Sequence, residues 1–128
     1  MEGLSLDEEN LEISTNGRIV PIHHMTYTSD IVIFYLSEKI PINQEFKIKL
    51  NYTGKVLKEP DRGLYNITYT GRNESEKVGV VAQLKAIYAR RVVPCFDEPD
   101  FKAYWTITVI HPEGTIALSN AKEISSEK

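Results

Sequence analysis

Cysteine is nearly absent from this sequence, and other features that would indicate a function class are missing altogether. The single cysteine among 128 residues, Cys95, excludes an intrachain disulfide. This fits a reducing compartment, and it also fits a piece of a secreted protein whose other cysteines lie elsewhere. No uninterrupted apolar run approaches the roughly 20 residues that span a bilayer, and residues 1–5 lack the basic and apolar regions of a signal peptide. We therefore expect no membrane segment in this chain.

The charge and glycine patterns argue against two further classes. The 15 Lys+Arg and 18 Asp+Glu give a formal net charge of −3, whereas a nucleic-acid binder usually presents a basic face. The seven glycines are scattered and follow neither the G-x-G-x-x-G nor the Walker spacing of phosphate-binding loops. We expect no nucleic-acid partner.

Histidine is also scarce, with only His23, His24 and His111. The H-E-x-x-H pattern, which places two zinc ligands on one helix face with a glutamate as base, is absent. His23 and His24 are adjacent, so in an extended chain they would point to opposite faces and could not easily hold one ion. We expect no metal site, no cofactor and no catalytic residue in this chain.

The one nucleophile to weigh is Cys95. With His111 as base and Asp97 as orienting group, the residue types of a thiol hydrolase are present. Cys95 lies between Pro94 and Phe96, however, and an apolar setting usually indicates a buried, inert thiol. A thiol hydrolase therefore stays the least favoured alternative.

The length and the strand pattern predict one small all-β domain. A chain of 128 residues can form a single modest core. Turn signals recur about every 8 to 12 residues, which is typical of an antiparallel sandwich or open sheet. We expect a frayed or disordered segment over residues 1–10, a turn at 60–63 and one helical turn within 86–91. The expected strands cover residues 11–13, 19–20, 31–36, 45–52, 64–70, 78–84, 103–111 and 116–119.

Local patterns support individual strands. Asn16-Gly17 is a strong hairpin signal between the first two. Residues 31–36 form a short apolar run that favours a strand buried on both faces. Residues 45–52 and 103–111 instead alternate between apolar and polar side chains, which is typical of half-exposed strands.

Three triplets match the acceptor pattern for N-linked glycosylation. They begin at Asn51, Asn66 and Asn73. With seven asparagines and 17 Ser+Thr, chance predicts about one such triplet. Three is a modest excess, and coincidence in an intracellular chain remains the alternative.

Residues 89–103 carry the most specific pattern, Ala-Arg-Arg-Val-Val-Pro-Cys-Phe-Asp-Glu-Pro-Asp-Phe-Lys-Ala. This segment closely resembles the signature of zinc metalloaminopeptidases of the aminopeptidase N type (gluzincin aminopeptidases), and the likeness continues in order from about Gly63 to Asn120. Seven positions form what we call the structural signature: Arg90, Pro94, Cys95, Phe96, Asp97, Glu98 and Pro99. We expect Pro94 and Pro99 to bracket a stiff turn, Phe96 to anchor it, and Asp97 or Glu98 to pair with Arg90, because buried charges must be paired.

The resemblance implies a saddle-like, all-β N-terminal domain that packs on a catalytic domain and caps one side of its active site. In that family the catalytic domain holds the zinc and hydrolyses the N-terminal amino acid of peptide substrates. This chain would then be a non-catalytic and truncated domain, which begins after the family's first strands and stops soon after Asn120. A free-standing structural or binding remnant is the alternative. The location would be extracellular or secreted for an aminopeptidase N-like parent, with the cytoplasm as the alternative.

The resemblance also assigns substrate-facing positions. The family reads Gln-x-Gln or Gln-x-Glu before the Ala-Arg pair, and the third position accepts a hydrogen bond from the substrate's free α-amino group. Here the stretch is Gln83-Leu84-Lys85, so Gln83 matches and Lys85 departs. Lysine has donors but no acceptor, which puts amine recognition at this position in doubt.

Overall fold

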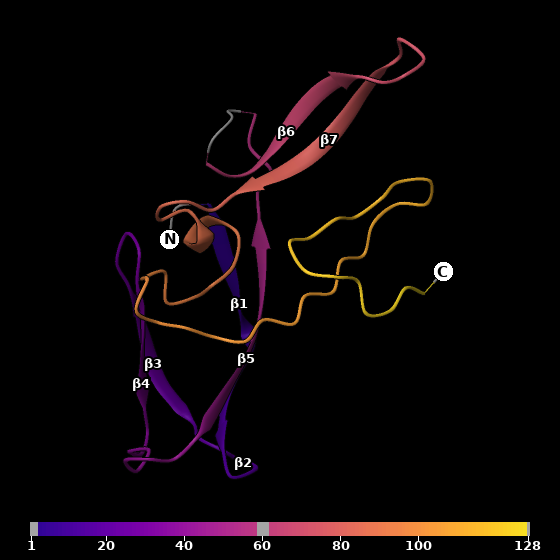
Figure 1. The fold of residues 1–128 in the computed structure, drawn as a ribbon. Helices are drawn as coiled ribbons and strands as arrows, with labels where there is room; N and C mark the ends of the chain where they lie inside the picture. Colours follow the sequence, from indigo (N-terminus) through magenta and orange to yellow (C-terminus); the bar gives the residue numbers. More distant parts are fainter. Residues whose placement is uncertain (1–2, 59–61, 128) are drawn as a thin grey trace.

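The chain folds as a series of antiparallel β-strand pairs, as the sequence predicts. The computed structural model describes residues 3–58 and 62–127 (Figure 1). Of the turn expected at 60–63, positions 60 and 61 lie outside these residues. The elements are β1 (Leu4–Thr15), β2 (Arg18–Ile19), β3 (Ile22–Tyr27), β4 (Val32–Leu36), β5 (Phe46–Gly54), β6 (Gly63–Thr70), β7 (Glu76–Gln83) and one 3-10 helix, η1 (Ala89–Arg91). They form a β2-β1-β5 sheet and two hairpins, β3-β4 and β6-β7, so the all-β expectation is confirmed.

The β1–β2 turn forms where Asn16-Gly17 predicts it. Asn16 has a φ of 49° and Gly17 a φ of 76°. Positive φ at both central residues is the geometry of a tight hairpin turn whose twist matches that of the strands. The register continues with Ser14 opposite Ile19, so the local signal is sufficient to fix this corner of the sheet.

Residues 4–10 correct the expectation of a frayed start. They belong to β1, which pairs with β5 from Leu4 opposite Gly54 to Asp7 opposite Asn51. The register then shifts at a bulge between Asp7 and Glu12. The segment is acidic and lacks its own periodicity, but β5 supplies backbone partners that no local pattern could reveal. Residues 1 and 2 lie outside the described part.

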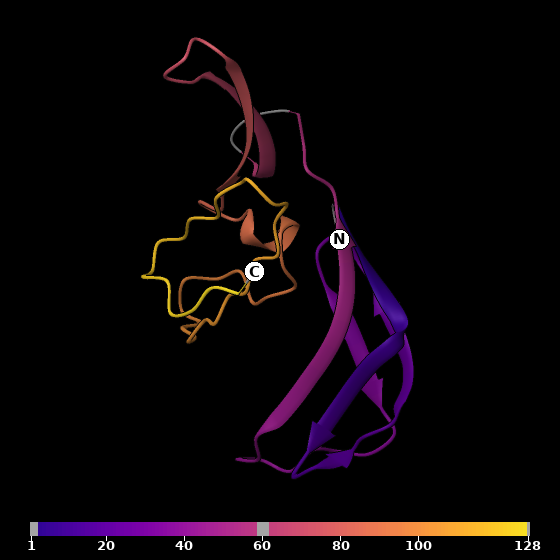
Figure 2. The ribbon, with the colours of Figure 1, turned by 90° about the vertical axis from the view of Figure 1, so that its right-hand side faces the viewer.

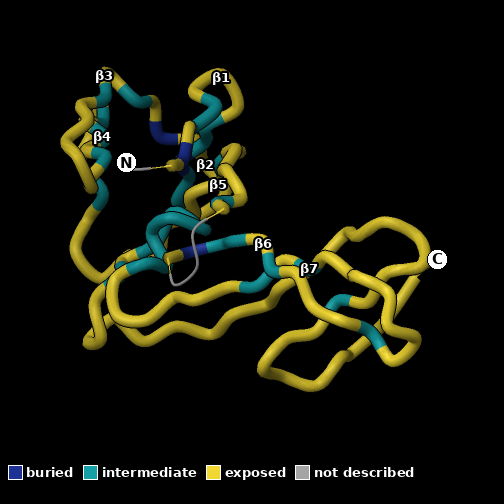
Figure 3. Tube along the Cα trace, turned by 90° about the horizontal axis from the view of Figure 1, so that it is seen from above, coloured by how far each residue is buried: buried dark blue, intermediate teal, exposed yellow. Residues whose placement is uncertain are grey.

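The buried core is very small. Among the described residues, the buried hydrophobic side chains are Leu4, Ile13 and Val20, at 8%, 3% and 2% exposure. Ile13 and Val20 are neighbours, because the Val20 N–H donates to the Ile13 carbonyl at 2.8 Å, whereas Leu4 lies at the start of β1 beside Gly54. Figure 3 shows that most of the trace is exposed or intermediate. The expectation that residues 31–36 are buried on both faces is wrong, because Ile33 and Tyr35 of β4 are 41% and 43% exposed. A two-stranded sheet with one covered side cannot bury both faces.

The β6-β7 hairpin projects from the rest of the molecule (Figure 1). Its ladder runs without a bulge from Gly63 opposite Gln83 to Thr70 opposite Glu76. At its base Gly63 has a φ of 74°, and an added Cβ would lie 3.1 Å from the Arg91 Cβ. Glycine is therefore needed at this position, both for the backbone conformation and for the approach of η1.

The last quarter of the chain contradicts the sequence expectation. Residues 103–111 and 116–119 form no strand, and Figure 2 shows this segment as an irregular loop beside the sheets. Trp105, Ile107 and Val109 are 60%, 65% and 55% exposed. Alternating apolar and polar side chains make a segment suitable for a sheet, but a strand also needs a partner for its backbone groups. The described part of the chain provides no such partner here.

Candidate functional site

The structural signature forms a loop that closes back on η1. The Arg90 side chain donates from Nε to Asp97 Oδ2 at 3.0 Å, and the Arg90 backbone N–H donates to the same oxygen at 3.2 Å. A third bond runs from the Arg90 guanidinium to the Asp97 carbonyl at 3.3 Å. The hydrogen bond with Asp97 raises the pKa of Arg90. The expected ion pair is thus confirmed for Asp97.

A second carboxylate approaches Arg90 from a distant part of the chain. Asp30, in the turn between β3 and β4, lies 3.8 Å from the guanidinium. That turn is closed by the Thr28 N–H, which donates to the Ile31 carbonyl at 2.9 Å. Arg90 therefore connects η1, the signature loop and the β3-β4 hairpin. No local pattern pointed to Asp30, because its partner lies 60 positions further along the sequence.

Phe96 does not anchor the loop as expected. It is 72% exposed and stacks on Phe101, which is 61% exposed, with ring centroids 5.1 Å apart. Glu98 and Pro99 of the structural signature are also exposed. The Arg90–Asp97 pair stabilises the loop, and the rings of Phe96 and Phe101 form a stack that is exposed to solvent.

Cys95 is half-buried within this loop. Burial, followed by the nearby Asp97 carboxylate, raises the pKa of the thiol, while Arg90 acts in the opposite direction. A catalytic thiol needs a lowered pKa and a nearby base. The proposed base, His111, instead has Nδ1 at 2.8 Å from Thr115 Oγ1 and 3.2 Å from the Pro112 carbonyl. The structure therefore gives no support to a Cys-His-Asp set.

Gln83 and Lys85 lie together just before η1. Gln83 is the last residue of β7, and its Oε1 accepts a hydrogen bond from the Lys85 backbone N–H at 3.2 Å. Both side chains are exposed, and the Lys85–Ala86 peptide bond is cis. The side-chain oxygen of Gln83 is thus engaged locally, while the Lys85 ammonium is on the surface.

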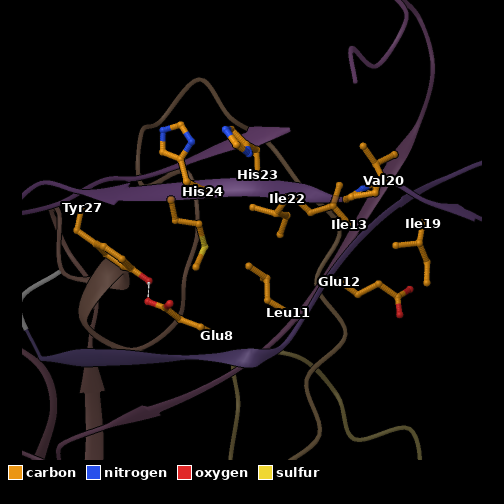
Figure 4. Close-up of a pocket in the computed structure, with 12 residues that line it drawn as sticks. Glu8, Leu11, Glu12, Ile13, Ile19, Val20, Ile22, His23, His24 and Tyr27 are labelled. Carbon is orange, nitrogen blue, oxygen red and sulfur yellow. Dashed lines mark hydrogen bonds between the residues drawn. The ribbon is translucent and has the colours of Figure 1, made fainter. Parts of the chain in front are cut away.

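The adjacent histidines also differ from expectation. The β3–β4 register skips His23, which forms a bulge between Ile22 and His24. Their rings come within 5.1 Å, and His24 stacks on Tyr35 at 4.1 Å. Figure 4 shows both rings on the same side of β3. Two histidines do not make a metal centre, and the described residues contain no group of three or more His, Cys, Asp or Glu that could hold an ion.

A hollow of about 440 Å³ lies between β1 and β3. Tyr27 and Glu8 point toward one another across it, and the Tyr27 hydroxyl donates to the Glu8 carboxylate (Figure 4). This bond raises the pKa of Tyr27. Leu11, Ile13 and Ile22 line the same hollow. It has the character of an incompletely filled core and lies apart from the signature loop.

The three glycosylation triplets all place their asparagine on the surface. Asn51 is in β5, Asn66 is in β6, and Asn73 is in the turn that joins β6 to β7. None of the helical structure in residues 3–58 and 62–127 is long and apolar enough to cross a membrane.

Comparison with known proteins agrees with the signature. The family profile described as "Peptidase M1 N-terminal domain" matches residues 2–128. The chain is 41% identical over 96 residues to "Aminopeptidase N" of Haemonchus contortus, a match that covers 75% of the chain and 10% of that protein. It is 35% identical over 118 residues to "Aminopeptidase Q" of Homo sapiens, covering 90% of the chain and 12% of that protein.

A plant relative fits the same pattern. "Aminopeptidase M1-B" of Oryza sativa subsp. japonica is 37% identical over 103 residues, covering 80% of the chain and 11% of that protein. No solved structure gives a match. The chain spans about a tenth of the length of these curated relatives. By its profile and its relatives, the chain belongs to the family of peptidase M1 N-terminal domains.

Proposed function

We propose that this chain is a non-catalytic N-terminal domain that packs on the catalytic domain of an aminopeptidase and caps one side of its active site. The distribution of apolar side chains carries the proposal. Three are buried in the described residues, while 25 large hydrophobic side chains are exposed. Extensive exposed apolar surface marks an interaction site, so a large partner surface is required.

The exposed apolar residues gather on particular faces. Phe46, Ile48 and Tyr52 of β5 are 53%, 38% and 38% exposed and alternate with polar neighbours. The Phe96–Phe101 stack offers a second apolar surface beside the signature loop. We propose that the catalytic domain covers these faces and that the sheets then complete a saddle.

The chemistry of the parent enzyme is proposed to reside outside this chain. The names of the relatives support hydrolysis of N-terminal amino acids from peptides, and the resemblance assigns zinc to the catalytic domain. The described residues offer no ligand set for zinc, so no step of hydrolysis is assigned to them. We expect the isolated chain to hold no stoichiometric zinc and to cleave no aminoacyl substrate, whether or not zinc is added.

The packing is tested by amide hydrogen exchange in the full-length protein and in the isolated chain. Residues 103–111 are exposed and unpaired here, so their amides should exchange rapidly in the isolated chain and at least tenfold more slowly in the full-length protein. Equal exchange in both would contradict the proposal. It would favour a free-standing binding remnant, for which the transcript would also lack a downstream H-E-x-x-H.

Gln83 and Lys85 are proposed to face the substrate's amino terminus. Lysine cannot accept a hydrogen bond from an ammonium group. Two like charges about 4 Å apart repel by roughly 1 kcal/mol in water and by several times that in a drier cleft. A parent enzyme with Lys85 at this position should therefore recognise free amino termini poorly.

The substitution Lys85→Gln in the full-length protein tests this role. Because it removes the cation and restores an acceptor, kcat/KM for aminoacyl substrates should rise about fivefold or more, the rate equivalent of roughly 1 kcal/mol. Lys77→Gln, on the exposed side of β7, is the matched control and should leave kcat/KM unchanged. No rise for Lys85→Gln would mean that Lys85 turns away from the substrate.

A further inference from the structure

We propose that Asn73, at the free end of the β6-β7 hairpin, carries an N-linked glycan, and that Asn51 and Asn66 are far less occupied. Exposure does not distinguish the three acceptor triplets, since all three asparagines are exposed. Their surroundings in the fold are different. These surroundings decide which position can hold a bulky, permanently hydrated group.

Asn73 lies in a turn outside the strand ladder. The ladder ends at Thr70 opposite Glu76. Beyond it the Gly71 N–H donates to the Ser75 carbonyl at 2.8 Å, and the Glu74 N–H donates to the Gly71 carbonyl at 3.0 Å. Figure 1 shows this turn at the far end of the projecting hairpin, away from the β2-β1-β5 sheet and η1. A glycan there extends past the end of the hairpin and covers neither of its faces.

Asn66 lies in the middle of the same hairpin, opposite Val80. Val80 and the nearby Val78 are 56% and 69% exposed, and they share one face with Asn66 because side chains alternate along a strand. Under the proposed function, on which this step rests, a partner surface covers the exposed apolar faces, and a glycan on Asn66 would keep this face in water. The cost of exposed apolar area argues for low occupancy at this position.

Asn51 is constrained by the bulge of β1. It pairs with Asp7 across the ladder, and its side chain contributes, after that of Asn10, to lowering the pKa of the Asp7 carboxyl. It also lines a hollow of about 250 Å³ together with residues of the bulge such as Glu9. A sugar on Asn51 would crowd this bulge.

The modification is a group transfer that needs one co-reactant, an oligosaccharide linked to a lipid pyrophosphate. The Asn73 Nδ2 forms a bond to the anomeric carbon of the first sugar, and the bond from that carbon to the pyrophosphate oxygen breaks. The lipid pyrophosphate leaves, and one amide proton is released. No oxidation or reduction occurs, and the Ser75 hydroxyl completes the acceptor triplet.

Trypsin separates the three positions, which makes the test direct. Cleavage after Lys49, Lys55, Arg62, Arg72 and Lys77 places the asparagines on three peptides, 50–55, 63–72 and 73–77. The native full-length protein, isolated from the cells that make it, is digested before and after treatment with peptide N-glycosidase in heavy-oxygen water. Peptide 73–77 should be recovered mainly after treatment, with an oxygen-labelled aspartate at position 73.

Variants of the full-length protein provide the second measurement. When it is expressed through a eukaryotic secretory pathway, Asn73→Gln and Ser75→Ala should each remove one glycan from its electrophoretic mobility. Asn120→Gln, an exposed asparagine outside any acceptor triplet, should leave the mobility unchanged. Recovery of unmodified peptide 73–77 in full yield from the untreated native protein would overturn the proposal, as would a glycan found mainly on peptide 50–55 or 63–72.

Discussion

Two segments of this chain have nearly the same alternation and different structures. Residues 45–52 and 103–111 both alternate apolar and polar side chains. The first forms most of β5, which makes eight registered pairs with β1. The second remains irregular with its apolar side chains in solvent. The comparison shows that alternation encodes the ability to join a sheet, while membership depends on whether a partner edge is within reach.

The largest loss of stability should follow a truncation in the small core, next to the paired strands β1 and β5. Ile13→Ala removes a side chain that is 3% exposed, and such truncations typically cost about 2–5 kcal/mol. Because the core has few members, this change should unfold the β2-β1-β5 sheet. Loss of amide protection in β1 and β5 of the isolated chain is the measurement.

Ile107→Ala is the matched control on the unpaired side. Ile107 is 65% exposed, so its truncation should change the free energy of unfolding of the isolated chain by no more than about 0.5 kcal/mol. Equal losses for the two variants would break the comparison, since they would show that residues 103–111 are already packed.

A smaller effect is expected from the Arg90–Asp97 pair, which lies between the paired strands and the irregular residues 103–111. Asp97→Asn removes the charge that holds Arg90, whose guanidinium and backbone both bind Asp97. The signature loop should open more often, and chymotrypsin should cleave after the exposed Phe96 several-fold faster. Breaking the outer pair between Arg18 and Glu38, whose side chains are 74% and 41% exposed, should leave this rate unchanged. Identical cleavage rates in the unchanged protein, in Asp97→Asn and in the protein without the Arg18–Glu38 pair would show that Arg90 does not close the loop.

The smallest effect concerns the reactivity of Cys95, which lies in the same signature loop. Burial and the Asp97 carboxylate raise the pKa of this thiol, so at neutral pH less thiolate is present than in a free cysteine. Labelling by a thiol reagent should be slower than for free cysteine, and its rise with pH should be displaced upward. Asp97→Asn should move the profile back toward lower pH, because one raising contribution is lost and Arg90 remains. Native labelling as fast as that of free cysteine would contradict this and revive the nucleophile hypothesis.

Local features of the fold could be predicted from the sequence. Asn16-Gly17 defines its turn because the required backbone angles are a property of those two residues. The Arg90–Asp97 pair could be expected because the two residues are seven positions apart in one stiff loop. The helical turn within 86–91 is confirmed as η1.

Long-range features could not be predicted. The pairing of residues 4–7 with β5 joins positions about 50 apart, and the segment itself carries no strand pattern. The approach of Asp30 to Arg90 depends on how a hairpin turn lies against η1. The bulge at His23 placed two histidines on the same side although strict alternation would have separated them. In the first two cases the deciding partner is remote in sequence, and in the third it is the partner strand of the same hairpin, whose register with β3 no local pattern fixes.

The pairing of β1 with β5 also has a consequence for the order of assembly during synthesis. The β3-β4 and β6-β7 hairpins join neighbouring segments, as in Tyr27 opposite Val32 and Thr70 opposite Glu76, and can close within microseconds. Leu4 instead pairs with Gly54, so the start of β1 must wait until some 50 further residues have been made. Pulse-labelled hydrogen exchange during refolding should protect the two hairpins before residues 4–7. Within this chain, the start of β1 is therefore made long before the strand with which it pairs.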